Sequence, residues 1–126
     1  MGILTKAPAV AFILTRGRAA LTPFYSDVLG LTQLDEGSFS TRFDMNGSTL
    51  HLTTVEDHTP SPHPVLGWAV PDITAASRAL VEKGVTFNIY PGFDMDEYGI
   101  WTSPDGTSKV NWFNDPEGNV LSMTQG

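Results

Sequence analysis

The chain repeats one order of predicted elements, and this repeat constrains its fold more than any other feature. An apolar strand at 9–15 is followed by a short helix and three strands. A polar, proline-rich segment at 56–64 comes next, and an apolar strand at 65–70 then begins a second series. This series has one helix and three strands, which are expected at 85–90, 108–114 and 119–125. The sequence therefore predicts an α+β fold made of two βαβββ modules within one domain. The expected ranges are about 7–55 for module 1, 56–64 for the linker and about 65–126 for module 2.

The two predicted helices differ in how well the sequence defines them. In the second, Asp72 is an N-cap, an apolar stripe follows it, and Gly84 ends the helix. The first helix has two possible starts. Thr22 and Pro23 resemble an N-cap followed by proline at the first helical position, but a start near Arg18 would place the proline at the helix edge or at a kink.

The last strand of each module follows a glycine turn, which allows the modules to be aligned. Asn46-Gly47 is a strong hairpin signal, and His51 lies four residues after Gly47. Ser122 lies four residues after Gly118, so His51 and Ser122 are predicted to occupy equivalent positions. The first strands are expected to align as Val10, Phe12 and Leu14 with Leu66, Trp68 and Val70.

The segment STLHLTT at 48–54 alternates strictly and predicts a half-buried strand. Leu50 and Leu52 face a core, whereas Thr49, His51 and Thr53 face the other side. A lone histidine there could be a metal ligand, a general base or a polar residue lining a pocket. The spacing leaves all three roles open.

The second module contains an extra segment at 91–106, because Gly84 to Gly118 is twice as long as Gly30 to Gly47. This insertion either determines ligand specificity or covers the sheet as an edge hairpin. Its Tyr98 and Trp101 could close over a ligand, or could anchor the insertion to the sheet.

Charge and composition exclude several functions. The chain has 14 acidic and 7 basic residues and a net charge of −7, so it is a poor partner for nucleic acid, and it has no basic cluster for a membrane surface. No apolar run is long enough to span a membrane. The absence of cysteine excludes disulfides, thiolate metal sites and thiol nucleophiles. We expect a cytoplasmic protein.

Three segments in this order and spacing resemble one family. They are FYSDVLGL at 24–31, PDITAASRALVEKGV at 71–85 and NDPEGNVLSM at 114–123. The chain resembles the vicinal oxygen chelate superfamily, also called glyoxalase/bleomycin-resistance/dioxygenase proteins. The resemblance implies curled mixed β-sheets around a cavity, with the helices outside.

Metal-dependent members of this superfamily take one ligand from the first and one from the last strand of each module. Carried over to this chain, these positions are Val10, His51, Leu66 (or Gly67, if the register is shifted by one) and Ser122. Only His51 is a strong ligand, whereas a catalytic divalent site needs about three protein donors. We therefore expect no metal and no other cofactor.

The resemblance implies a small organic ligand held in an aromatic pocket, with His51 as the candidate acid–base residue. The expected ligand-binding residues are Phe12, Thr49, Thr53, Trp68, Tyr98, Trp101 and Ser122. Whether the protein is an enzyme stays open. It could sequester its ligand, as the bleomycin-binding members do, and those members predict a homodimer.

Two other functions stay open. One is a metal-dependent lyase, isomerase or dioxygenase that uses His51 with insertion carboxylates from Asp94, Asp96 or Glu97. The other is an interaction module that binds no small ligand.

Overall fold

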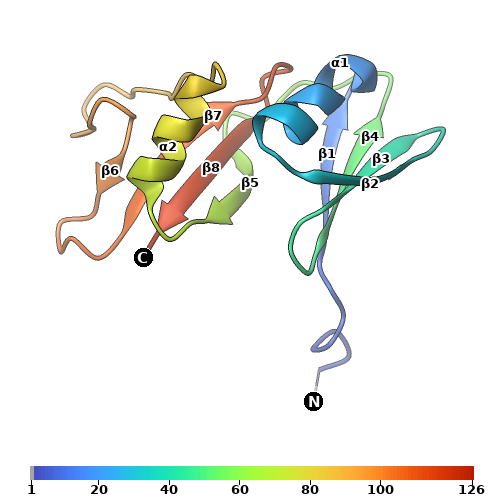
Figure 1. Cartoon of the computed structure of the whole chain (residues 1–126), viewed down its shortest axis with the longest axis horizontal. Coiled ribbons are helices and arrows are strands. Elements are labelled where there is room, and N and C mark those ends of the chain that lie inside the picture. Colours follow the sequence, from blue (N-terminus) through green and yellow to red (C-terminus); the bar gives the residue numbers. More distant parts are fainter. Residues whose placement is uncertain (1) are drawn as a thin grey trace. The chain divides into compact units, whose positions relative to one another are not determined.

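The computed structural model describes residues 2–126 and divides the chain into two compact units, Met1–His58 and Thr59–Gly126. The boundary lies inside the predicted linker at 56–64. Each unit contains one four-stranded mixed sheet, which we call the N-terminal and the C-terminal sheet (Figure 1). The predicted α+β class and the two βαβββ modules are confirmed.

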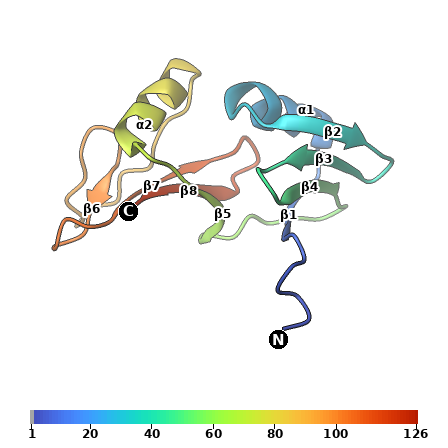
Figure 2. The ribbon, with the colours of Figure 1, turned by 60° about the horizontal axis from the view of Figure 1, so that its bottom comes forward.

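In the N-terminal unit, both helical segments lie on one side of the sheet (Figure 2). The elements are β1 (Val10–Thr15), α1 (Arg18–Pro23), the π-helix η1 (Phe24–Val28), β2 (Thr32–Glu36), β3 (Ser40–Asp44) and β4 (Thr49–Thr54). The strand order is β1-β4-β3-β2, with β1 parallel to β4 and the other neighbours antiparallel. Asn46 and Gly47 form the β3–β4 turn with positive φ angles of 55° and 103°, as the sequence predicts.

The helix-facing side of this sheet forms the core of the N-terminal unit. Leu50 and Leu52 are fully buried there, as the alternation in STLHLTT predicts. Tyr25 of η1 is also fully buried, and its ring lies 6.1 Å from that of Phe43 on β3. Because Leu50 and Leu52 point to the side of β4 opposite to His51, the core and the candidate site use different faces of one sheet.

The first helix begins at Arg18, so the start at Thr22 is wrong and the alternative with Pro23 at the helix edge is correct. The Thr22 hydroxyl donates to the Arg18 carbonyl at 2.8 Å instead of capping a helix. Pro23 has no N–H group and ends α1, and the chain continues as a wider turn. There, the Leu29 N–H donates to the Phe24 carbonyl five residues earlier, at 3.0 Å.

The C-terminal unit has the same order of first strand, helix and three further strands. Its elements are β5 (Pro64–Ala69), α2 (Ile73–Glu82), β6 (Trp101–Thr102), β7 (Lys109–Asn114) and β8 (Val120–Gln125). The strand order is β5-β8-β7-β6, with β5 parallel to β8. Asp72 caps α2 as predicted, because its carboxylate accepts from the Ala75 N–H at 3.1 Å.

The prediction of a strand at 85–90 is wrong. This segment makes only one isolated bridge, Phe87 to Phe113, and the outer strand of the sheet is β6, which lies inside the insertion. The Asn88 N–H still donates to the Trp112 carbonyl at 2.8 Å, but the next N–H on that side, the one of Tyr90, donates to Met95 Sδ at 3.5 Å and does not continue the ladder. The short β6 pairs with β7 in its place.

The core of the C-terminal unit lies between its sheet and α2. Its buried apolar residues include Ile73, Val85, Phe87, Ile100, Phe113, Leu121 and Met123. Val120 is also buried, but its pairing with Asn114 places it on the other face of the sheet, with Ser122. Asn111 is also fully buried, and its Nδ2 donates to Ser77 Oγ at 2.9 Å and to the Tyr98 carbonyl at 3.2 Å. These bonds tie the insertion to β7 and α2. Within residues 2–126, no helix has the length and apolar character needed to cross a membrane.

Candidate functional site

Each sheet has one face that carries its helix and one that does not, and we call the second the open face. Residues paired between neighbouring strands share a face, so the register assigns the members of each face. The open face of the N-terminal sheet consists of Val10, Phe12 and Leu14 on β1, Thr49, His51 and Thr53 on β4, Ser40, Arg42 and Asp44 on β3, and Thr32 and Asp35 on β2.

His51 lies in the middle of this open face. It pairs with Phe12 on one side and with Arg42 on the other. The Phe12 and His51 rings are 5.2 Å apart at an interplanar angle of 61°, an edge-to-face contact. His51 is half-buried, whereas Phe12 is 61% exposed. The structure therefore places four predicted ligand-site residues, Phe12, Thr49, His51 and Thr53, on one surface.

Arg42 extends this row, although the sequence analysis did not select it. Arg42 Nε lies 2.9 Å from Asp35 Oδ1, and Nη2 lies 2.5 Å from Oδ2, a bidentate ion pair. The hydrogen bond from Arg42 lowers the pKa of Asp35, and the charges of Arg42 and His51 act in the same direction. The Asn46-Gly47 turn was the missed signal, because a two-residue hairpin loop fixes Arg42 opposite His51.

On the C-terminal sheet the predicted register of the first strand is wrong by one residue. Gly67, not Leu66 or Trp68, lies beside Ser122, because an irregularity between Pro64 and Leu66 shifts the pairing. A Cβ atom added at Gly67 would clash with Ser122 Oγ and lie 3.2 Å from the Ser122 carbonyl oxygen. Trp68 instead pairs with the buried Met123, so it lies on the face that carries α2.

Two other aromatic residues, Trp101 and Trp112, lie on the open face of the C-terminal sheet, where the sequence predicted Trp68. Trp112 pairs with Ser122, and the sequence analysis did not assign it to the site. Trp101 also belongs to this face, because it pairs with Val110 two residues before Trp112. The Tyr90 ring packs edge-to-face on Trp112 at 5.7 Å.

Tyr98 does not join this group. Its carbonyl accepts from Asn111, which faces α2 through its bond to Ser77. Its side chain interacts with Arg78 of α2 and raises the pKa of that guanidinium. The structure therefore places Tyr98 beside α2 and not beside Ser122.

The residues at the family's metal positions do not fit a tightly bound divalent ion. Val10 and Gly67 supply no donor atom, and Ser122 supplies only a hydroxyl. Within residues 2–126, no three histidine, aspartate or glutamate side chains form a group that could hold a metal. In the insertion, Asp96 Oδ1 already accepts from the N–H groups of Tyr98 and Ile100, at 2.8 and 3.0 Å.

The sequence model of the Glyoxalase/Bleomycin resistance protein/Dioxygenase superfamily matches residues 10–123, and the chain belongs to this superfamily. No curated protein matches the chain.

Solved structures share the fold at low identity. A superfamily member from Sphaerobacter thermophilus has a TM-score of 0.74 at 21% identity, covering 98% of this chain and 100% of its own. A lactoylglutathione lyase from Agrobacterium tumefaciens has a TM-score of 0.72 at 15% identity, covering 95% and 93%. A member from Alicyclobacillus acidocaldarius has a TM-score of 0.72 at 16% identity, covering 94% and 89%. At these identities the likeness concerns the fold alone.

Proposed function

We propose that this protein binds a small organic ligand without a resident metal ion, and that the open face of the N-terminal sheet carries the binding residues. The observation that carries the proposal is the row in which Phe12, His51 and Arg42 lie side by side on β1, β4 and β3. An exposed phenyl ring next to donor groups suits a flat ligand that bears polar substituents. Superfamily membership supports the small-molecule class.

His51 is the residue through which a bound ligand could exchange a proton. Imidazole is suited to this work near neutral pH. The hydroxyl groups of Thr49 and Thr53 lie on the same face of β4, one on each side of His51, and can orient polar groups of the ligand. In this proposal the protein either sequesters the ligand or changes it by acid–base chemistry, as a homodimer in the cytoplasm.

Binding of 1-naphthol, a flat neutral probe with one hydroxyl group, tests the proposal by ¹H–¹⁵N NMR titration. We expect shift changes at β1 and β4, and about fivefold weaker binding by Phe12→Ala, because an aromatic contact contributes about 1 kcal/mol. Phe39→Ala is the matched control, since Phe39 is 76% exposed in the turn between β2 and β3. Its binding should change less than about twofold, within the usual effect of a surface substitution.

Two results would contradict the proposal. One is a titration in which millimolar naphthol leaves β1 and β4 unperturbed or affects the Phe12 and Phe39 variants equally. The other is metal analysis of protein purified without chelator that finds about one tightly held Fe, Mn, Ni or Zn per chain. That stoichiometry would favour the metal-dependent lyase, isomerase or dioxygenase.

A further inference from the structure

The open face of the N-terminal sheet changes in polarity from one edge to the other. The β1 edge is apolar, and Val10, Phe12 and Leu14 are 48, 61 and 39% exposed. The next strand, β4, carries His51 between two threonines, and β3 and β2 carry the Arg42–Asp35 ion pair. A ligand that matches this gradient has an apolar part over β1 and a charged group over β3.

The order of residues along the row favours a negative charge on the ligand. Starting from Phe12, a ligand meets His51 and then Arg42 before it reaches Asp35, because Asp35 lies on the outer strand β2. Both Asp35 oxygens accept hydrogen bonds from Arg42. Asp44 is the other carboxylate on this face, and it lies one row away, opposite Thr49.

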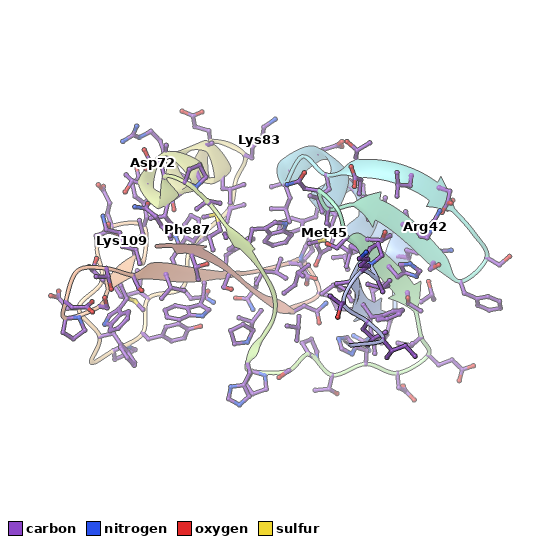
Figure 3. The ribbon with its side chains drawn as sticks, turned by 90° about the horizontal axis from the view of Figure 1, so that it is seen from below. Arg42, Met45, Asp72, Lys83, Phe87 and Lys109 are labelled. Carbon is purple, nitrogen blue, oxygen red and sulfur yellow. The ribbon has the colours of Figure 1, made fainter. Side chains whose placement is uncertain are left out.

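Arg42 keeps donor capacity toward such a group. Its bonds to Asp35 use Nε and Nη2, and among residues 2–126 no acceptor is assigned to Nη1. The bidentate contact holds the plane of the guanidinium (Arg42 is labelled in Figure 3), so the remaining N–H groups are already oriented. Imidazole can donate as well, so His51 and Arg42 together form a donor pair for a carboxylate.

We infer that the ligand is a planar organic acid whose carboxylate binds Arg42 and His51 while its apolar ring lies over Phe12. This inference rests on the proposed function and names the class of its ligand. Asp35 is then a positioning residue. It orients the guanidinium, and its negative charge weakens the attraction of Arg42 for the ligand.

The experiment compares 1-naphthoate with 1-naphthamide, which have the same ring system and differ in charge. NMR titrations at about 0.15 M salt limit the long-range repulsion from the protein's net charge, because the screening length is then about 8 Å. We expect the wild type to bind the acid about fivefold tighter than the amide, as an exposed ion pair contributes up to about this factor. Arg42→Gln should remove the preference and change amide binding less than about twofold.

The direction in which Asp35→Asn changes the affinity for naphthoate distinguishes a binding role of Arg42 from a structural one. If Arg42 binds the carboxylate, removal of the competing negative charge should tighten naphthoate binding by about two- to fivefold. If the ion pair only supports the sheet, both variants should weaken binding of both probes equally. Lys83→Gln and Glu82→Gln are charge-matched controls in the C-terminal unit, and neither should alter the preference.

Each other outcome overturns the inference in a distinguishable way. Equal binding of both probes at β1 and β4 refutes the acid class and leaves the proposed function intact. Tighter binding of 1-naphthylmethylamine than of naphthoate, weakened by Asp35→Asn, shows a cationic ligand instead. If neither naphthoate nor naphthamide perturbs the open face, the inference fails, and if naphthol also fails, so does the proposed function.

Discussion

Gly67→Ala tests the register that determines which residues share a face with Ser122. A Cβ atom at this position would overlap Ser122 Oγ and approach the Ser122 carbonyl oxygen to 3.2 Å. Overpacking of this kind costs about 1–3 kcal/mol. Replacing a strand glycine with alanine returns about 0.5–1 kcal/mol, because the unfolded chain becomes less flexible. We therefore expect the free energy of unfolding to fall by about 1–2 kcal/mol.

Combining Gly67→Ala with Ser122→Ala tests whether the overlap with Ser122 Oγ causes this loss of stability. Without Oγ only the carbonyl contact remains, so Gly67→Ala should cost less than about 0.5 kcal/mol in that background, giving a coupling energy of about 1 kcal/mol or more. Urea unfolding followed by far-UV circular dichroism measures all four proteins. Gly37→Ala is the control, because its Cβ would meet only the Ser40 carbonyl oxygen at 3.7 Å. A coupling energy near zero would refute the pairing of Gly67 with Ser122, and Trp68 would then be assigned to the open face.

Three further predictions have defined outcomes. Asp72→Ala should lower the unfolding free energy by about 1 kcal/mol, because the carboxylate caps α2. Asp72→Ser should keep most of that stability in the same urea assay, because serine is also a good N-cap. Asn111→Leu should cost about 2–4 kcal/mol, since it leaves the buried Ser77 hydroxyl and the partly buried Tyr98 carbonyl without their donor, and a neutral result would contradict this. NMR titration should give Asp105 a pKa of about 2, lowered first by the Ser103 hydroxyl and then by the Thr107 N–H. Its contribution to stability is present above its ordinary pKa near 4 and is lost as the pH falls through about 2. Ser103→Ala should return the pKa toward 4.

Alternation and turn chemistry predicted the parts of the site that depend on local sequence. Thr49, His51 and Thr53 share a face because side chains of a strand alternate, and no distant contact is needed to infer it. The Asn46-Gly47 turn equally determined which β3 residue lies beside His51, so Arg42 was within reach of the sequence.

Features that depend on tertiary contacts were not predictable in this way. The irregularity between Pro64 and Leu66 moves every later residue of β5 to the opposite face, which is why Trp68 was misplaced. Tyr98 was misplaced because the path of the insertion depends on bonds from Asn111 and on the interaction with Arg78, both far away in the sequence. The outer strand is β6 and not 85–90 for a related reason, since the Tyr90 N–H donates to Met95 Sδ within the insertion instead of continuing the pairing with β7.

The separation of faces also explains how residues at the candidate site can vary while the chain keeps this fold. In β4 the fully buried Leu50 and Leu52 face the core, while the candidate site positions lie on the open face. Substitutions at Val10 or His51 therefore change the donor set without removing core contacts, whereas a change at Leu50 would open a cavity that costs several kcal/mol. Under the proposed function, selection for folding acts on one face and selection for ligand binding acts on the other. This independence means that substitutions of Phe12 and Arg42 should report on binding rather than on folding.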